Sequence, residues 1–101
     1  MTYLLVQYGV PADVNAFNRY YHETHVPLAK ALPGLREFRV SDGLVNPLAG
    51  TAPHLIAQLT FDSPEAVEAA LASPEGQATV ADLPNFVTGG VSIMVYTARL
   101  A

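Results

Sequence analysis

Two of the three histidines in this 101-residue chain stand close together, in the segment YYHETHVPLA. His22, Glu23 and His25 resemble the HExxH zinc motif, in which two histidines four residues apart share one helical face and the glutamate acts as a base. The spacing is one residue short, and on an α-helix Glu23 would point about 160° away from His25. A third ligand would have to come from elsewhere, for example His54 or Asp82. We therefore predict no bound metal.

His25 is better suited to proton transfer than to metal binding. The helix predicted around it has an apolar face made of Val14, Phe17, Tyr21, His25 and Leu28. Imidazole groups in general exchange protons near neutral pH, so one on an apolar face is suited to general acid–base catalysis. The alternative is a buried structural histidine that hydrogen-bonds a backbone carbonyl left free by Pro27, which has no N–H. The sequence leaves both interpretations open, and His25 is the candidate catalytic residue.

Four further side chains are candidates for substrate binding. Tyr21 shares the apolar face with His25, and its hydroxyl could reach a ligand. His22 lies at the edge of that face. His54 opens a predicted strand on the same side as Gln58, whose amide needs hydrogen-bond partners that a ligand could supply.

Composition excludes several other classes of function. The absence of cysteine removes disulfides, thiolate nucleophiles and cysteine-bound metals. No serine lies in a G-x-S-x-G context, and no glycine-rich phosphate loop occurs. The net charge is -4 and the five basic residues are dispersed, which argues against nucleic acid as a partner. Without a basic leader or a run of about 18 apolar residues, we expect a soluble cytoplasmic protein without a membrane partner.

Apolar periodicity and turn residues predict four strands and two helical regions in one domain, residues 1–101. The strands are expected at residues 3–9, 35–41, 54–62 and 90–99. The resulting order, β-α-β-β-α-β, is that of the ferredoxin-like α+β fold, in which two helices cover one face of a four-stranded antiparallel sheet.

Local signals place the ends of the helices. Asp13 and Ser63 can each accept hydrogen bonds from a first helical turn, and a weaker helical stretch should begin at Ser73. Pro27 cannot donate a backbone hydrogen bond and disfavours helical geometry at Val26. The first helix should therefore kink or restart near Val26.

The strands are apolar on both sides. In the last strand Val91, Ile93 and Val95 alternate with Met94 and Tyr96. Helices can cover only one face of the sheet, so the other face needs a partner. The simplest partner is a second copy of the chain, which predicts a homodimer.

The sequence also resembles the EthD family of the dimeric α+β barrel superfamily, along nearly its whole length. The most specific segments are H-x-P at His25–Pro27 and A-D-x-x-N-F at Ala81–Phe86. The resemblance implies a homodimer in which two sheets form a barrel, with a cleft between each sheet and its helices. Enzymes of the superfamily include isomerases, cyclases and cofactor-free monooxygenases, and we expect no haem because no proximal histidine can be assigned.

These observations predict a small EthD-like protein that binds a small hydrophobic or aromatic molecule. Its chemistry would be acid–base catalysis by His25 without a cofactor, of an isomerase, cyclase or monooxygenase-like kind. The alternative is a non-catalytic auxiliary or binding protein of an oxidative degradation pathway. Both functions would use the same pocket.

Overall fold

The computed structural model describes residues 1–101 and has the predicted order of strands and helices. Its elements are β1 (Thr2–Tyr8), α1 (Val14–Tyr20), the π-helical segment η1 (Tyr21–His25), α2 (Val26–Lys30), β2 (Glu37–Val40), β3 (Leu55–Phe61), α3 (Pro64–Ala72), α4 (Pro74–Asp82), the 3₁₀ turn η2 (Leu83–Asn85) and β4 (Val91–Thr97). The strands are slightly shorter than expected at several of their ends. The predicted ferredoxin-like α+β fold is confirmed.

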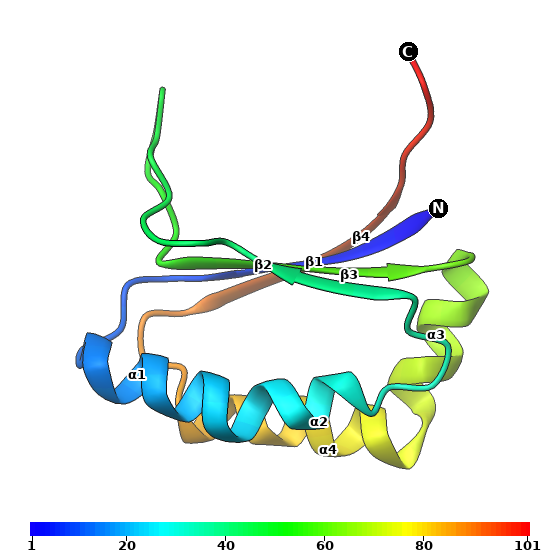
Figure 1. Ribbon diagram of the computed structural model, residues 1–101, viewed down its shortest axis with the longest axis horizontal. Helices are drawn as coiled ribbons and strands as arrows, with labels where there is room; N and C mark the ends of the chain where they lie inside the picture. Colours follow the sequence, from blue (N-terminus) through cyan, green and yellow to red (C-terminus); the bar gives the residue numbers. More distant parts are fainter.

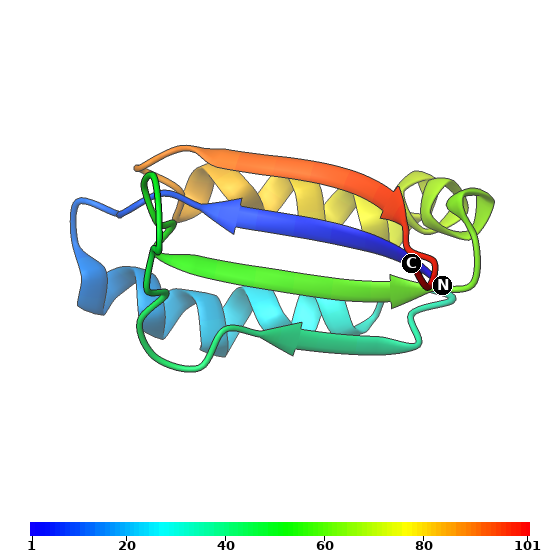
Figure 2. The ribbon, with the colours of Figure 1, turned by 90° about the horizontal axis from the view of Figure 1, so that it is seen from above.

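The four strands form one antiparallel sheet in the order β2-β3-β1-β4. The view from above shows β1 and β3 in the centre and β4 and β2 at the edges (Figure 2). The connections from β1 to β2 and from β3 to β4 run through the helices, because in each case the two strands are not neighbours in the sheet. The central position of β1 places Tyr8, its last residue, deep in the molecule, where it is 2% exposed.

All helices lie on one face of the sheet (Figure 1). β3 alternates as its sequence predicts: Leu55, Ala57, Leu59 and Phe61 point to the helices and are buried. The predicted caps are confirmed, because Asp13 accepts from the Ala16 N–H, Ser63 from the Ala66 N–H and Ser73 from the Gly76 N–H. The core therefore fills the layer between sheet and helices.

Of the two outcomes expected near Val26, the restart is confirmed, because α2 begins at this residue, and the kink is absent. The backbone stays right-handed helical through His25 and Val26, and α2 continues η1 without a break in direction (Figure 1). The N–H of Val26 bonds to the carbonyl of Tyr21, five residues back, so this turn is wider than an α-helical one. In a regular helix the ring of Pro27 would clash with the carbonyl four residues earlier, and the wider turn relieves this clash.

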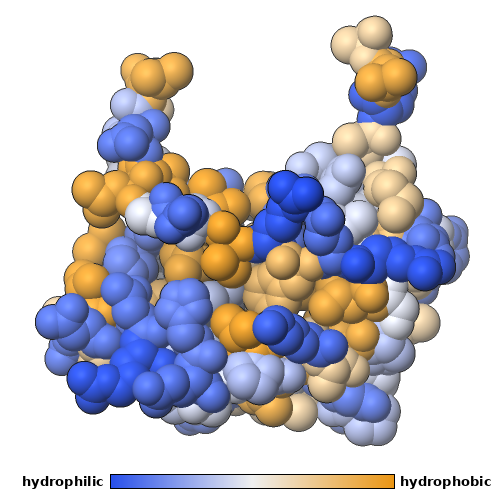
Figure 3. Space-filling view, viewed as in Figure 1, coloured by the Kyte–Doolittle hydropathy of each residue, from blue (hydrophilic) through white to orange (hydrophobic).

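The face of the sheet away from the helices is open and flanked by two projections. One is the loop of residues 41–54, and the other is the C-terminal segment 98–101; both rise on the side opposite the helices (Figure 1). Apolar atoms stand at the ends of both projections (Figure 3), where Leu48 and Leu100 are fully exposed. Met94 and Tyr96 are each more than 40% exposed. None of the helices is long and apolar enough to cross a membrane.

The position of α4, which carries part of the site described below, depends on Gly76. A Cβ atom at this position would lie 2.1 Å from the carbonyl oxygen of Ala70 and 2.6 Å from Cα of Leu71. Both are backbone atoms of the α3 region, so they cannot move aside as a flexible side chain could. The short α3–α4 connection therefore needs glycine here.

We expect Gly76→Ala to lower the free energy of unfolding by about 1–3 kcal/mol, because the added methyl group forces α3 and α4 apart. In an open helix the same substitution raises stability by about 0.5–1 kcal/mol, so the sign of the change is diagnostic. Denaturant unfolding followed by circular dichroism measures it. A more stable variant would show that the two helices do not approach so closely.

Candidate functional site

The side chains of His25 and Asp82 meet in the layer between sheet and helices. His25 is the last residue of η1 and Asp82 is the last residue of α4, and both are more than 90% buried. Nδ1 of His25 lies 2.9 Å from Oδ2 of Asp82. The contact joins two segments that lie 57 positions apart in the sequence.

Asp82 is held as a carboxylate by three hydrogen-bond donors. Besides His25, the hydroxyl of Tyr20 donates to Oδ1 at 2.5 Å and the amide of Asn85 donates to Oδ1 at 3.0 Å. Burial is the largest single influence and would raise the pKa of Asp82, but the hydrogen bonds from Tyr20, Asn85 and His25 together lower this pKa below its usual value. The carboxyl group is therefore ionised at neutral pH and can only accept hydrogen bonds.

An ionised Asp82 fixes the tautomer of the neutral His25 ring. Because the carboxylate cannot donate, Nδ1 must carry the proton that lies between the two groups. In the neutral ring Nε2 then has a free lone pair and is the atom that can accept a proton. This is the arrangement that a general base needs.

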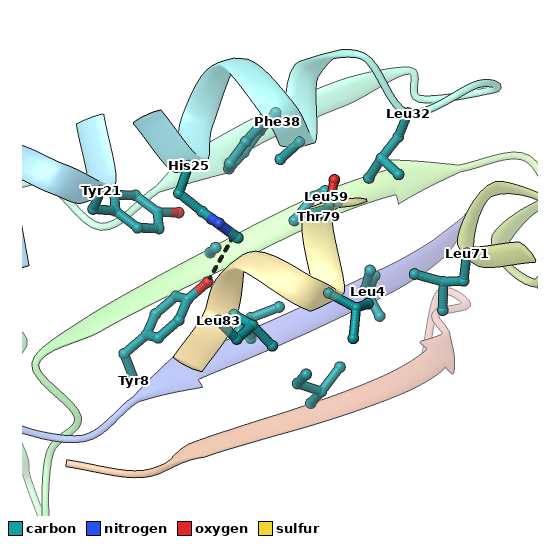
Figure 4. A pocket seen from close by; sticks show the side chains of 15 residues that line it. Leu4, Tyr8, Tyr21, His25, Leu32, Phe38, Leu59, Leu71, Thr79 and Leu83 are labelled. Atoms are coloured by element: carbon teal, nitrogen blue, oxygen red, sulfur yellow. Dashed lines mark hydrogen bonds between the residues drawn. The ribbon is translucent and has the colours of Figure 1, made fainter. Parts of the chain in front are cut away.

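The hydroxyl of Tyr8 is the neighbour of Nε2. Its oxygen lies 3.5 Å from this nitrogen, at the limit of a hydrogen bond (Figure 4). Burial, and to a smaller extent the charge of Asp82, raise the pKa of Tyr8 well above its ordinary value. Tyr8 therefore keeps its proton, and the long contact leaves Nε2 only weakly engaged.

These groups border an apolar cavity of about 130 Å³ between the sheet and the helices. Thirteen of its 15 lining residues are hydrophobic, so the interior offers few groups for polar contacts. His25, Tyr8 and Tyr21 lie at one end of it, and Leu32 and Leu71 lie toward the other (Figure 4). The lining residues also include Val80 of α4 and Ile93 of β4, each 48% exposed. The cavity therefore reaches the surface between α4 and β4.

Only two of the five predicted site residues, Tyr21 and His25, share this cavity. His22 is exposed and borders a separate hollow at the surface, as does His54. Nε2 of His54 contacts Oδ1 of Asn18 at 2.8 Å, which places this ring against α1 on the helical side of the sheet. The expectation that His54 lies on the same side of the sheet as Gln58 is therefore wrong. His54 precedes β3, and its ring packs edge-on against Phe17 of α1, with 5.0 Å between centroids.

Gln58 lies on the open face of the sheet, as its place in the alternation predicts. It borders a shallow polar hollow with Arg39 and Thr60, on the opposite side of the sheet from His25. The sheet separates it from the cavity, so Gln58 cannot contact a molecule bound beside His25. A single pocket containing all five predicted residues does not exist in the folded chain.

The expected partner of a structural His25 is also wrong. Its Nδ1 bonds to the side chain of Asp82 and not to a backbone carbonyl freed by Pro27. No group of three or more His, Cys, Asp or Glu side chains is placed to hold a metal ion, and neither His54 nor His22 lies beside the pair.

The sequence interpretation missed the roles of Tyr8, Tyr20, Asp82 and Asn85. From the sequence alone, no site role is assigned to Tyr8, Tyr20 or Asn85, and Asp82 is considered only as a possible metal ligand. The signal that could have found them is the segment A-D-x-x-N-F. Its Asp and Asn belong to the hydrogen-bond group, and its Phe86 packs on the His25 ring with 4.7 Å between centroids.

Fold and site together define a ferredoxin-like α+β protein with a histidine–carboxylate pair beside an apolar cavity. The family model described as the EthD domain matches residues 11–90. The chain therefore belongs to the EthD family.

Relatives of known sequence or structure support this assignment. The chain is 40% identical over 91 residues to an uncharacterized 11.0 kDa protein of the thcB-thcC intergenic region of Rhodococcus erythropolis, covering 88% of this chain and 86% of that protein. An EthD family protein from Bacillus halodurans superposes with a TM-score of 0.88 at 28% identity, covering 98% and 99% of the two chains. A dimeric ferredoxin-like protein of unknown function from Jannaschia shares the fold, with a TM-score of 0.73 at 20% identity over 96% and 98%.

The tautomer of His25 can be tested without a substrate. We expect Asp82→Asn to reverse it, because the asparagine amide donates toward Nδ1 and the ring proton then moves to Nε2. Two-bond ¹H–¹⁵N NMR spectra distinguish a protonated ring nitrogen from an unprotonated one. The same change should lower the free energy of unfolding by about 1–3 kcal/mol, since hydrogen bonds to an ionised group are lost.

Asp62→Asn is the matched control, because Asp62 is an exposed carboxylate paired with Arg36 on the surface. It should leave the nitrogen shifts of His25 unchanged. If wild-type Nε2 carries the proton, or if Asp82→Asn leaves both nitrogen shifts unaltered, the assigned tautomer is wrong.

Proposed function

We propose that this protein binds a small apolar molecule in the cavity and transfers a proton to or from it with His25, without a cofactor. One observation carries the proposal: a buried imidazole, oriented through Nδ1 by an ionised carboxylate, stands at the wall of an otherwise apolar cavity. A proton acceptor in such a position can act on a carbon-bound or oxygen-bound hydrogen of the ligand.

The charge of Asp82 supports the proton-transfer step. When Nε2 of His25 takes up a proton the ring becomes a cation, and the adjacent carboxylate stabilises that cation. The interaction is stronger in the buried layer than in water, because little solvent screens it. Tyr20 and Asn85 hold the carboxylate in place, so it need not reorient during the reaction.

The second candidate function is binding without turnover, as expected of an auxiliary protein in an oxidative degradation pathway. The observation that favours it is that both ring nitrogens of His25 have neighbours within the chain, Asp82 on one side and Tyr8 on the other. An imidazole whose two nitrogens both contact other side chains can have a purely structural role in the wall of a binding cavity. The length of the Tyr8 contact, 3.5 Å, favours the catalytic function.

Exchange of hydrogen for deuterium distinguishes the two functions. We expect the wild-type protein in D₂O to accelerate exchange at the weakly acidic C–H groups of a small uncharged probe, cyclohexanone, and ¹H NMR measures the exchange rate. His25→Gln should reduce the accelerated rate about 100-fold or more, because the base is removed.

The control in this experiment is ligand binding by the same variant. Gln can still donate a hydrogen bond toward Asp82, so the cavity should persist and the ligand should still bind. Binding by the wild type with no exchange above the buffer rate would support the non-catalytic function and contradict the proposed one.

We further propose that the protein is a homodimer joined through the open face of its sheet, consistent with relatives of this fold that are described as dimeric. Tyr3 and Tyr96 lie side by side on that face, with ring centroids 5.4 Å apart and the rings tilted by 34°, and Met94 lies on the same face of β4. The projections that end in Leu48 and Leu100 rise on the same side, where a second copy would cover them. Burying these side chains would supply the driving force for association.

Met94→Glu should convert the dimer to a monomer, because a carboxylate without a partner is costly to bury between two sheets. Size-exclusion chromatography with light scattering measures the mass. Val14→Glu is the matched control: Val14 has the same exposed fraction, 41%, but lies on α1. A wild-type monomer at micromolar concentration would contradict the proposed interface.

A further inference from the structure

The hydroxyl of Tyr21 is a buried polar group without a partner in the chain. The Tyr21 side chain is fully buried, and its Oη is the one buried side-chain nitrogen or oxygen atom for which the protein provides no hydrogen bond. The ring belongs to the wall of the cavity, and the hydroxyl points toward the same space as the His25 imidazole (Figure 4). Buried hydroxyls are almost always hydrogen-bonded, so this one needs a partner from inside the cavity.

The other polar groups of the cavity wall already have partners. Tyr8 lies against Nε2 of His25, and Nδ1 of His25 bonds to Asp82. The hydroxyl of Thr79 donates to the carbonyl of Glu75 in its own helix. Tyr21 therefore provides the one fully available O–H donor in a wall that is otherwise apolar.

The geometry brings this donor close to the proposed base. The ring centroids of Tyr21 and His25 are 5.6 Å apart, and those of Tyr21 and Tyr8 are 5.4 Å apart. Burial raises the pKa of Tyr21 far above its ordinary value, so the hydroxyl keeps its proton and donates. An acceptor atom bound to Tyr21 would thus hold the neighbouring atoms of its molecule near Nε2 of His25.

Charge and volume restrict the ligand further. No lysine or arginine borders the cavity, and the carboxylate of Asp82 stands behind His25, so an anionic ligand would be repelled and left without a counter-ion. The cavity of about 130 Å³ is close to the roughly 150 Å³ of an apolar protein cavity that holds benzene. It therefore suits a molecule with a single ring.

We propose that the ligand is an uncharged single-ring carbonyl compound whose oxygen accepts a hydrogen bond from Tyr21. The inference rests on the proposed function, because it assumes a ligand in this cavity. It deepens that function by naming the chemical class of the ligand and a second residue that binds it.

His25 and Tyr21 together can convert a carbonyl compound to its enolate and back. Nε2 of His25 takes a proton from the carbon next to the carbonyl, the C–H electron pair becomes a C=C bond, and the C=O π pair moves to the oxygen. The negative oxygen of this enolate then accepts a stronger hydrogen bond from Tyr21. If solvent replaces the proton on His25 before it returns to the same carbon, the result is hydrogen exchange. Return of the proton to the far end of a conjugated enolate gives isomerisation, and neither outcome needs a co-reactant other than water.

A pair of isosteric ligands tests the inference. Cyclohexanone and methylenecyclohexane have the same shape and differ in one position, where a carbonyl oxygen is replaced by a CH₂ group. We expect Tyr21→Phe to weaken binding of cyclohexanone about 2- to 10-fold, the range for one net hydrogen bond, and to leave binding of methylenecyclohexane unchanged or slightly stronger. NMR titration gives both dissociation constants, and Tyr96→Phe, on the open face of the sheet, should change neither.

The outcomes separate this inference from the proposed function. If neither compound binds the wild type, both the ligand class and the use of the cavity are wrong. If both bind and Tyr21→Phe changes them equally, only the role of Tyr21 is overturned.

A measurement on the wild type alone makes the test independent of the variant. The ¹³C resonance of bound, carbonyl-labelled cyclohexanone should lie downfield of its position in hydrocarbon solvent, because hydrogen bonding polarises the carbonyl. A resonance at the hydrocarbon position would overturn the inference even if Tyr21→Phe failed to fold.

Discussion

The hydrogen bond between His25 and Asp82 is the contact on which the organisation of this protein depends. It joins the C-terminal end of η1 to that of α4 within the single helical layer, and it does so with a carboxylate that is almost fully buried. Burying an ionised carboxyl group is costly, and the cost is offset only because Tyr20, Asn85 and His25 all donate to it. The ends of α4 and η1 are therefore fixed relative to each other. The direction of the imidazole follows from the same constraint.

The widened turn of η1 is the second feature that determines where the side chains of the site lie. A π-helical turn in an otherwise α-helical layer places Tyr21 and His25 on the same wall and leaves room for Pro27 after them. Such turns are less favourable than regular α-helix and occur often at functional sites. The segment therefore combines a local departure from regular structure with two of the side chains that line the cavity, Tyr21 and His25.

The cavity and the unpartnered hydroxyl both work against stability. An apolar space of this size forgoes packing contacts that a filled core would have, and the hydroxyl of Tyr21 lacks the hydrogen bond that it would make to water in the unfolded chain. Proteins concentrate such departures at the places where they bind or react, and the two found here adjoin one another. On the other face of the sheet Met94 and Tyr96 are exposed near the polar hollow that Gln58 borders, so the two faces differ in kind: the helices enclose a cavity on one, and the other is open.

The sequence by itself determined the fold and singled out His25. Alternating residues in β3, the caps at Asp13, Ser63 and Ser73, and the order of strands and helices were all readable, because each depends on neighbours within a few positions. The segments H-x-P and A-D-x-x-N-F were recognisable as family features, but no local feature of the sequence indicated that the two segments contact each other. That Asp82 is the partner of His25, that Tyr8 and Tyr20 complete the group, and that His54 and Gln58 lie outside the cavity were decided by the tertiary structure alone. The physical reason is that a contact across 57 residues is created by the packing of helices on the sheet and leaves no periodic signal in the chain.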